Sequence, residues 1–443
     1  MKFTIEEIVR ATGAEVLKCV NRSGMFRIST DTRTIEYTDL FLPLSGENFD
    51  GHDFINKAVE NGARGFFTAK KELSHPDAKI ILYVKDPLKS YLRLARYCRR
   101  KYNPVTIAIT GSSGKTTTKE MMASVMEQGF RTHKSKLNHN NEIGMCQTIL
   151  SMAENTEVLV LEMGMRARGE IELLSKYAEP DIGVIVNTGT AHIGRLGSVE
   201  NIARAKCEIG SYLHDEGVLI AHDSELIRKF NIFKGKTIYP GLDSPYLEIL
   251  DEKIDSSVFS YKGREYTLNV EGEYNIQDAL FVIETAIQFG MTHEKIANGL
   301  KNYSPIGQRW EIQAIKGLKI INDSYNANPD SMKAAIKAFL SLYSGKKALV
   351  LGDMGELGEN EVKYHEQVGE FVKKLSEKEK VTLITVGELA RHIGEKAELD
   401  FVNFSKNEDA AKYILENLSE STTILFKASR SMKFEQIIEE LKK

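Results

Sequence analysis

One segment limits what this chain can fold into more than any other. It reads VTIAITGSSGKTTT from Val105 to Thr118, an apolar run followed by a glycine-rich turn and the start of a helical pattern. Gly111 and Gly114 carry no Cβ, so the backbone there can approach an anion closely. The amides of the turn and the N-terminus of the following helix would then point at phosphate oxygens. The segment therefore predicts a strand, a phosphate-binding loop and a helix within an α/β fold.

The residues of this loop indicate that the phosphates belong to a nucleotide, which we expect to be ATP. Lys115 can reach the β- and γ-phosphates, and the hydroxyl of Thr116 can bind Mg²⁺. The strict motif has a glycine where this chain has Ile109, so the match is GxxGK[ST] without the leading glycine. An incidental glycine-rich turn is the alternative, and the strand–loop–helix context argues against it. The residues expected to hold the nucleotide are Gly111, Ser112, Ser113, Gly114, Lys115, Thr116 and Thr117.

Strand-like and helical patterns alternate after the loop, which is typical of a mostly parallel sheet with helices on both faces. The expected central elements are strands at Val158–Leu161, Ile182–Val186 and Val218–Ala221 and helices at Thr116–Gln128, Val199–Leu213 and Asn275–Phe289. Short runs within Pro240–Glu271 indicate an antiparallel extension.

A third block alternates again and predicts a second, smaller doubly wound, Rossmann-like unit. Its expected strands are Lys319–Asn322, Ala348–Leu351, Thr382–Val386 and Thr423–Phe426, and its helices are Ser331–Leu342, Val362–Leu375 and Lys433–Leu441. We expect three α/β domains, at residues 1–103, 104–305 and 306–443.

Composition and charge exclude several classes of protein. Of the 443 residues 42% are hydrophobic, and the formal net charge is −3, which gives no reason to expect nucleic acid or a membrane surface as a partner. The four cysteines lack zinc-site spacing. Met1–Lys18 lacks the apolar region of a signal peptide, and no apolar run is long enough to span a membrane. We therefore expect a cytoplasmic protein, with a monomer as the default.

Three polar residues form a candidate metal side for the loop. Glu162 follows the run Glu157–Leu161, at the strand end where such folds place a metal-binding carboxylate. His192 follows a later apolar run, in NTGTAHIG, and Lys206 lies on a helical pattern that begins near Val199. Taken alone, each of the three is better explained as a solvated surface residue.

Longer segments in all three blocks carry a family resemblance. They are STDTR and GENFDGHDF in the first block, TGSSGKTTTKE, NHNNEIG, EMG, AHIGRLGSVENIARAKCEI and EGEYNIQDAL in the second, and GQRWE and DSYNANPDSM in the third. Together these segments resemble the Mur ligases, ATP-dependent enzymes that form amide bonds in peptidoglycan synthesis. DSYNANPDSM is the most specific. It resembles the branch that joins D-Ala-D-Ala to UDP-MurNAc-tripeptide, and the DNPR-type motif of the relatives that add single amino acids is not found.

The resemblance implies a role for each matching residue of the ATP site. Lys115 and the loop amides would hold ATP, Asn275 would contact adenine, Arg309 would reach the phosphates and Asp323 the ribose. On the metal side the resemblance implies Mg²⁺ on Thr116 and Glu162 with His192 nearby, and a Lys206 carbamylated by CO₂. The implied catalytic residues are Lys115, Glu162, His192, Lys206 and Arg309.

The resemblance also implies substrate contacts in the first and third blocks. The residues are Asp31, Arg33, Gly46, Asp50 and His52 for the UDP end, Asn140 and Asn141 as further substrate contacts, and Asn326 and Asn328 for the nucleotide or dipeptide side. Three positions depart from the family's pattern. Thr32 stands where serine is common, and Leu137 and His139 stand where glycine and leucine are usual.

The implied reaction forms an acyl phosphate from a carboxylate and ATP, which the amine of D-Ala-D-Ala then attacks. We expect the third block to close on the central one and bring in Arg309. Two alternatives stay open. One is another amide ligase on this scaffold, either a different Mur ligase or a folylpolyglutamate-type enzyme. The other is a non-catalytic switch that binds ATP only to change its affinity for a partner.

Overall fold

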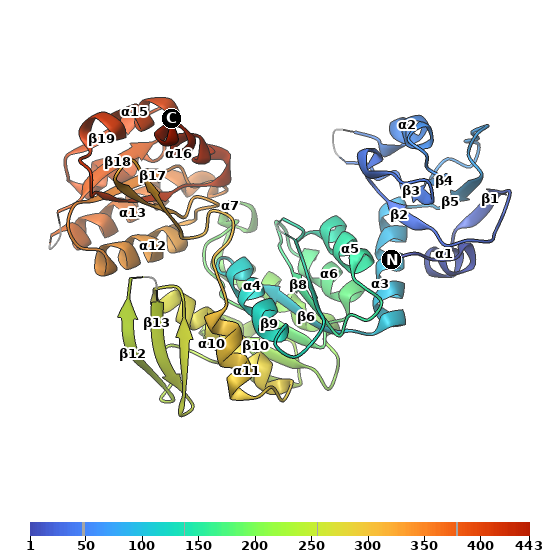
Figure 1. Cartoon of the computed structure of the whole chain (residues 1–443), viewed down its shortest axis with the longest axis horizontal. Helices are drawn as coiled ribbons and strands as arrows, with labels where there is room; N and C mark the ends of the chain where they lie inside the picture. Colours follow the sequence, from blue (N-terminus) through green and yellow to red (C-terminus); the bar gives the residue numbers. More distant parts are fainter. Residues whose placement is uncertain (47–48, 137, 255, 378–379) are drawn as a thin grey trace. The chain divides into compact units, whose positions relative to one another are not determined.

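The computed structural model describes residues 1–46, 49–136, 138–254, 256–377 and 380–443 (Figure 1). The chain divides into two compact units. The first comprises Met1–Ala108, Phe130–Met163 and Leu173–Asp181, and the second comprises Ile109–Gly129, Gly164–Glu172 and Ile182–Lys443. The division passes through strand β6 (Val105–Thr110) and helix α6 (Glu170–Ala178), so that the phosphate loop belongs to the second unit.

The first unit contains a five-stranded sheet in the order β1-β5-β4-β3-β2. Its strands are β1 (Glu15–Cys19), β2 (Arg27–Ser29), β3 (Asp39–Phe41), β4 (Gly65–Thr68) and β5 (Ile80–Tyr83). Only β1 is antiparallel to its neighbour. The helical segments of this region are α1 (Ile5–Thr12), η1 (Thr32–Thr34), η2 (Gly51–Phe54) and α2 (Ile55–Glu60), the η segments being 3₁₀-helices. Ile55 and Ala58 of α2 are buried with Phe41, Phe66 and Ile81 of the sheet.

Helix α3 (Pro87–Tyr102) follows this sheet, and its ends are set by local sequence. Oδ1 of Asp86 accepts a hydrogen bond from the amide of Lys89 at 2.9 Å, and Pro87 occupies the first turn, where no amide hydrogen is needed. Asn103, with φ 48°, ends the helix in the left-handed conformation. The rest of the first unit includes α5 (Glu142–Ser151) and the parallel pair β7 (Thr132–Lys134) and β8 (Val158–Glu162). All five residues of β8 are buried, as the apolar run predicts.

The second unit begins with helix α4 (Lys115–Met126) behind the phosphate loop. Three parallel strands follow, β9 (Ile182–Ile185), β10 (Val218–Ala221) and β11 (Lys236–Ile238). Their connecting segments are α7 (Ile193–Leu196), α8 (Val199–Cys207), η3 (Glu208–Tyr212) and α9 (Glu225–Phe230). The single helix expected over Val199–Leu213 is wrong in its second half, since α8 ends at Cys207 and continues as a 3₁₀ turn. Gly210, a poor helix former, lies in that turn.

The antiparallel extension predicted within Pro240–Glu271 is confirmed. It consists of β12 (Leu247–Lys253), β13 (Ser256–Tyr261) and β14 (Arg264–Leu268). Two helices, α10 (Glu273–Gln288) and α11 (His293–Lys301), follow it and pack against α4. The sequence pattern of Asn275–Phe289 is that of an amphipathic helix with one exposed face. Eleven residues of α10 are buried, however, so this helix is a core element.

The C-terminal part of the second unit is a six-stranded sheet in the order β15-β16-β20-β17-β18-β19, parallel except for β15. Its strands are β15 (Glu311–Ile315), β16 (Leu318–Asn322), β17 (Lys347–Gly352), β18 (Thr382–Val386), β19 (Phe401–Phe404) and β20 (Thr423–Lys427). Its helical segments are α12 (Pro329–Leu342), η4 (Gly358–Asn360), α13 (Glu361–Ser376), α14 (Arg391–Ala397), α15 (Asn407–Asn417), η5 (Arg430–Met432) and α16 (Glu435–Lys442). Figure 1 shows α12 and α13 on one face and α15 and α16 on the other, which is the doubly wound arrangement predicted.

Burial in this sheet alternates with the two faces. Ile320, Val350, Ile384 and Phe426 pack with α15 and α16, while their strand neighbours point to the opposite face. Among the helices of the described chain, none combines the length and the apolar character that crossing a membrane requires.

Candidate active site

The phosphate loop is held by a side chain that follows β9. Oδ1 of Asn187 accepts hydrogen bonds from the amides of Ser112 and Ser113, at 2.9 and 3.1 Å. Nδ2 of Asn187 donates to the carbonyl and hydroxyl oxygens of Ser113, at 3.1 and 3.0 Å. Nζ of Lys115 donates to the carbonyl of Gly111 at 2.7 Å. Protein contacts therefore keep the loop bent. Sequence reasoning missed Asn187, although it is the first polar residue after an apolar run.

Gly114 joins the loop to α4 in a conformation that favours glycine. Its φ is 78°, and a Cβ there would lie only 2.9 Å from Oδ1 of Asp278. Its carbonyl accepts hydrogen bonds from the amide and the hydroxyl of Thr118, at 2.8 and 3.0 Å. This carbonyl points toward α4, so the amide of Lys115, on the other side of the same peptide plane, points away from the helix. That is the direction an anion site requires.

Asp278 is a buried acid on α10, beside the phosphate loop. Burial raises the pKa of its carboxyl group well above that of an ordinary aspartate, although a hydrogen bond with Thr118 acts in the opposite direction. Burial therefore favours the neutral form of this side chain over the ionised one. An ionised carboxylate would repel phosphates, whereas a neutral one does not. The only sequence signal for this position was a single acid within the apolar stretch that follows Asn275.

Lys206 lies on α8 and is only 1% exposed. Burial, followed by the nearby cation of Lys115, lowers the pKa of Lys206 well below that of an ordinary lysine. A solvated helix lysine, which the periodicity alone favoured, is therefore excluded. Burial therefore favours the uncharged amine of Lys206 over its ammonium form.

His192 lies in the loop between β9 and α7, and it faces the C-terminal part of the unit. Its Nδ1 atom is 2.5 Å from Oε2 of Glu356, and the contact lowers the pKa of Glu356. Nε of Arg195 lies 3.8 Å from the other carboxylate oxygen. The backbone is also joined here, because the amide of Gly194 donates to the carbonyl of Glu356 at 3.0 Å.

A second contact joins the same two parts. Oδ2 of Asp330, in the first turn of α12, accepts hydrogen bonds from the amide and hydroxyl of Thr190, at 2.7 and 2.8 Å. Sequence reasoning missed both acids, since nothing in their local patterns distinguishes Asp330 or Glu356 from solvated carboxylates.

The third block supplies Arg309, Asp323 and Asn326. The guanidinium carbon of Arg309 lies 4.0 Å from the centre of the Tyr325 ring. Oδ2 of Asp323 accepts a hydrogen bond from Nζ of the buried Lys427 at 2.6 Å, and the same Nζ donates to the carbonyl of Asn326 at 3.1 Å. Lys427 therefore fixes the segment that begins DSYNAN.

The two remaining asparagines of the predicted ATP and dipeptide contacts also serve local structure. Nδ2 of Asn275 donates to the carbonyl of Glu271 at 2.6 Å. Asn328 caps α12, since its Oδ1 accepts from the amide of Ser331 at 2.9 Å. Both side chains are buried, so their orientations are set by the protein.

Glu162 ends β8 in the first unit and is 5% exposed. Its Oε1 accepts a hydrogen bond from Nδ2 of Asn140 at 3.2 Å, and its amide donates to the hydroxyl of Ser135 at 3.1 Å. Asn141 instead caps α5 through the amide of Gly144. The surface-turn alternative for Glu162 is therefore wrong. Leu137, where the sequence departs from the family's pattern, lies outside the described residues.

Near the start of the chain, Asp31 and Arg33 form a close pair. Oδ2 of Asp31 lies 2.7 Å from Nη2 of Arg33, and Oδ1 caps η1 through the amide of Arg33 at 2.9 Å. Gly46 forms a bridge with Phe49, with its amide 3.0 Å from the Phe49 carbonyl.

Asp50 and His52 form a second pair whose proton positions can be assigned. Nε2 of His52 must accept, because the amide of Ala69 donates to it at 3.0 Å. Nδ1 therefore carries a proton and donates to Oδ1 of Asp50 at 2.7 Å. Hydrogen bonds from His52 and from Ser45 lower the pKa of Asp50.

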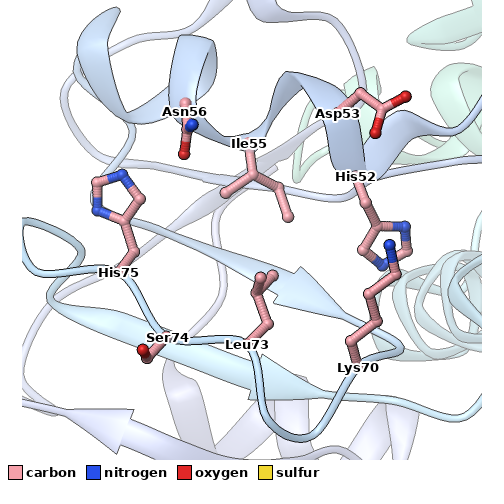
Figure 2. Close-up of a pocket in the computed structure, with 8 residues that line it drawn as sticks. All are labelled: His52, Asp53, Ile55, Asn56, Lys70, Leu73, Ser74 and His75. Carbon is pink, nitrogen blue, oxygen red and sulfur yellow. The ribbon is translucent and has the colours of Figure 1, made fainter.

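His52 also borders a cavity of about 370 Å³ in the first unit (Figure 2). Figure 2 shows His52 and Lys70 at one side of it, Asn56, Ser74 and His75 toward the other, and Ile55 and Leu73 facing each other in the middle. Asp31, Arg33 and Gly46 do not line this cavity.

The described residues include no cluster of three His, Cys, Asp or Glu side chains that could hold a metal ion alone. Each unit offers a buried oxygen donor of the kind that Mg²⁺ binds, the carboxylate of Glu162 in the first unit and the hydroxyl of Thr116 in the second. Mg²⁺ prefers oxygen ligands and commonly combines one or two protein donors with phosphate oxygens and water. Each donor, taken by itself, therefore has the chemistry of a ligand to Mg²⁺ that is bound together with a nucleotide.

Comparisons with known proteins agree with this arrangement. Family models match three segments of the chain: the Mur ligase family, catalytic domain, at residues 27–101; the Mur ligase middle domain at residues 109–286; and the Mur ligase, glutamate ligase domain, at residues 308–430. The UDP-N-acetylmuramoyl-tripeptide–D-alanyl-D-alanine ligase of Bacillus subtilis (strain 168) is 41% identical over 426 residues, which cover 94% of this chain and 92% of that protein. The Escherichia coli (strain K12) ligase of the same name is 30% identical and covers 94% and 93%.

Solved structures are also similar over nearly the whole chain. MurF from Acinetobacter baumannii has a TM-score of 0.91 at 29% identity and covers 100% of this chain and 99% of its own. MurF ligase from Thermotoga maritima in complex with ADP has a TM-score of 0.84 at 27% identity and covers 94% and 97%.

The three-domain α/β fold and the phosphate loop thus define an ATP-dependent ligase. The chain belongs to the Mur ligase family.

Proposed function

We propose that this enzyme joins D-Ala-D-Ala to UDP-MurNAc-tripeptide in peptidoglycan precursor synthesis, with ATP as the energy source. The observation that carries the proposal is the buried Lys206 beside the phosphate-loop Lys115. A nucleotide switch has no use for a buried lysine at this position, whereas a ligase can use its carbamate as an anionic metal ligand. The names of the full-length relatives support the same substrates.

The reaction needs two steps. The terminal carboxylate of the tripeptide attacks the γ-phosphorus of ATP, which forms a carbonyl–oxygen–phosphorus linkage and breaks the bond to ADP. The amine of D-Ala-D-Ala then attacks the carbonyl carbon, and the tetrahedral intermediate expels phosphate as the amine loses a proton. In the first step two anions approach each other, so Lys115 and Arg309 would offset their repulsion.

Thr116, Glu162, His192 and a carbamylated Lys206 are the residues that we propose for Mg²⁺. The ion would neutralise charge on the transferring phosphate and orient it. The buried position of Glu162 and its hydrogen bond from Asn140 support a fixed ligand rather than a solvated one. The carbamate would add oxygen donors, as Mg²⁺ prefers.

The nucleotide would lie along the phosphate loop, with its adenine at Asn275 and its ribose at Asp323. The UDP end would contact Asp31, Arg33, Gly46, Asp50 and His52 in a first domain. The fixed proton of His52 and the close Asp31–Arg33 pair support preorganised polar contacts there. Asn140 and Asn141 would lie beside the tripeptide, and Asn326 and Asn328 beside the nucleotide or dipeptide.

We propose domain limits at residues 1–103, 104–305 and 306–443, which agree with the three matched segments at 27–101, 109–286 and 308–430. The four cysteines are free thiols, which supports a reducing compartment such as the cytoplasm.

A coupled phosphate-release assay with UDP-MurNAc-tripeptide, D-Ala-D-Ala and ATP, each omitted in turn, tests the proposal. We expect turnover only when all three are present. Turnover with glutamate or a diamino acid in place of D-Ala-D-Ala would instead indicate another amide ligase of this scaffold. ATP binding without phosphate release under any acceptor would indicate a switch.

Replacement of the buried lysine gives an independent test. Lys206→Ala should lower kcat by about 10²–10³, the usual effect of losing one charge-stabilising group. Because a small carboxylate can occupy the place of a carbamate, added acetate or formate should partly restore activity. Lys176→Ala, a substitution on α6, is the control. Its kcat should stay at the wild-type value, and added acetate or formate should not change it. Full activity of Lys206→Ala would contradict the role.

A further inference from the structure

A buried carboxyl group joins the start of α10 to the C-terminal part of the same unit. Glu271 is 1% exposed, and its Oε1 accepts hydrogen bonds from Nε1 of Trp310 and from the hydroxyl of Tyr343, both at 2.6 Å. The two donors flank the sheet of the third block, one before β15 and the other after α12. A carboxyl oxygen with two short hydrogen bonds in a dry environment is held firmly.

Glu271 also contacts the residue proposed for adenine. Its backbone carbonyl accepts the hydrogen bond from Nδ2 of Asn275 at 2.6 Å. The ring of Tyr274, which precedes Asn275, packs edge-on against the ring of Trp310, with centroids 6.0 Å apart. Glu271 therefore touches the adenine side through its backbone and the third block through its side chain.

The chain around Trp310 is held in an unusual backbone conformation. Gln308 and Trp310 have φ values of 59° and 56°, a left-handed conformation that residues other than glycine rarely adopt. Such a conformation persists only where surrounding contacts impose it. The hydrogen bond from Trp310 to Glu271 is one such contact. Another is the hydrogen bond from Nη1 of Arg430 to Oε1 of Gln308 at 3.1 Å.

Arg309 lies between the left-handed residues Gln308 and Trp310. Its direction therefore depends on the backbone on either side, and its guanidinium rests 4.0 Å from the centre of the Tyr325 ring. The amide of Tyr325 donates to the carbonyl of Gln308 at 3.2 Å, so the segment that carries the ring is joined to the segment that carries the arginine.

We infer that Glu271 is a positioning residue for ATP, which fixes the direction of Arg309 through Trp310 and ties it to Asn275. The inference rests on the proposed function, in which Asn275 and Arg309 contact opposite ends of the nucleotide. The Glu271 side chain acts through its neighbours and does not itself contact ATP.

Three variants test this role. Glu271→Ala removes the acceptor and leaves two buried donors unpaired, so KM for ATP should rise about tenfold and kcat should fall about tenfold. Glu271→Gln keeps an acceptor oxygen and should stay within about threefold of the wild type. Tyr343→Phe removes one donor and keeps the bond to Trp310, so it should also retain most activity.

The matched control is a buried acid on α10, the helix that begins just after Glu271. Glu284 is 2% exposed and accepts a hydrogen bond from the Tyr261 hydroxyl at 2.7 Å. It lies nine residues after Asn275, or about 14 Å along the helix. Glu284→Ala should lower the melting temperature as Glu271→Ala does, yet leave KM for ATP unchanged. Equal kinetic effects of the two variants would reduce Glu271 to a general stabilising residue and overturn the inference.

A double-mutant cycle separates positioning from folding. If Glu271 acts through Arg309, then adding Glu271→Ala to Arg309→Ala should change kcat/KM by less than about twofold, because the arginine is already absent. Full additivity of the two effects would contradict the inference. If the Glu271→Ala variant does not fold, a variant that carries both Glu271→Gln and Tyr343→Phe takes its place in the cycle with Arg309→Ala.

The chain provides its own reporter, since Trp310 is its only tryptophan. Titration with a non-hydrolysable ATP analogue should shift its emission in the wild type and in Glu284→Ala, and should do so less in Glu271→Ala. This measurement distinguishes a failure of the proposed ligase function from a failure of the positioning role of Glu271. If the wild type bound ATP but released no phosphate, the proposed ligase function would fail, whereas an unaltered response of Trp310 in Glu271→Ala would overturn only the positioning role.

Discussion

Nδ1 of His192 lies 2.5 Å from Oε2 of Glu356, and both residues have left-handed backbones, with φ values of 64° and 62°. The two left-handed turns meet closely, since a Cβ at Gly194 would lie 2.3 Å from the amide nitrogen of Gly358. Two segments separated by more than 150 residues are thus joined by a side-chain pair and by backbone contact. His192 is also the residue proposed to lie near the metal, so this contact is coupled to the proposed site.

Glu356→Gln tests what the pair contributes. The two side chains are 23% and 39% exposed, so the loss in stability should be below about 1 kcal/mol. We expect kcat/KM to fall about tenfold while the melting temperature changes little, because the change frees His192 without opening the core. Phosphate release and thermal unfolding measure the two effects. Glu395→Gln, which removes an exposed pair with Arg391 on α14, is the control. Unchanged activity of Glu356→Gln would rule out coupling to the site.

Asn187→Ala should weaken ATP binding. The substitution leaves the amides of Ser112 and Ser113 without the acceptor that holds the loop bent. We expect KM for ATP to rise about tenfold, equivalent to about 1.4 kcal/mol of lost binding, with a smaller effect on kcat. Asn231→Ala is the matched control, because Asn231 also accepts a loop amide, that of Phe233 at 3.0 Å, away from the phosphate loop. If both variants left KM unchanged, the loop would not depend on this clamp.

The sequence predicted those parts of the fold whose signal is local. The apolar runs that became β8, β9, β10 and β17 are continuous and buried, so their patterns are strong. The short or weakly apolar elements β19 and α14 were missed, because their identity as strand and helix depends on the sheet against which they pack.

The candidate site divides in the same way. Lys115 and Thr116 were predictable from spacing alone, and Lys206 required the family resemblance because its helical position looks solvated. Asn187 and Asp278 were not predicted. Asn187 and Asp278 lie 73 and 164 residues after Gly114, and a local sequence pattern carries no information on contacts over such separations.

Asp278→Asn should stabilise the protein at neutral pH. An acid whose pKa is raised on folding favours the native state most below the unfolded pKa of 3.8, and that contribution is lost as the pH rises through the folded pKa. The isosteric amide cannot ionise and avoids the loss. We therefore expect the free energy of unfolding of the variant to exceed that of the wild type at pH 7 and to match it below about pH 3.8.

Urea unfolding between pH 3.5 and pH 8 measures this difference. Asp223→Asn is the control. The hydrogen bond from Arg228 lowers the pKa of Asp223, so this substitution should decrease the free energy of unfolding at neutral pH, where Asp278→Asn should increase it. A destabilised Asp278→Asn at pH 7 would mean that the carboxyl group is ionised beside the loop.

Glu179 should control the acid sensitivity of the first unit. It accepts hydrogen bonds from Arg96 and from Arg100, both on α3. Burial raises the pKa of Glu179, but the hydrogen bonds from Arg100 and Arg96 outweigh it and lower the pKa to about 2, against 4.5 for an ordinary glutamate. For an acid with a lowered pKa the stabilisation is complete above the unfolded value and is lost as the pH falls through the folded one.

We therefore expect Glu179→Gln to cost about 2 kcal/mol at pH 7, the usual size for hydrogen bonds to a charged group, and almost nothing at pH 2. Between about pH 4.5 and pH 2 the free energy of unfolding of the wild type should fall toward that of the variant. Glu15→Gln, which removes only the exposed contact with Lys71, should leave the pH dependence unchanged. A constant gap between wild type and Glu179→Gln across this range would show that the carboxylate is not what links α3 to the segment before β9.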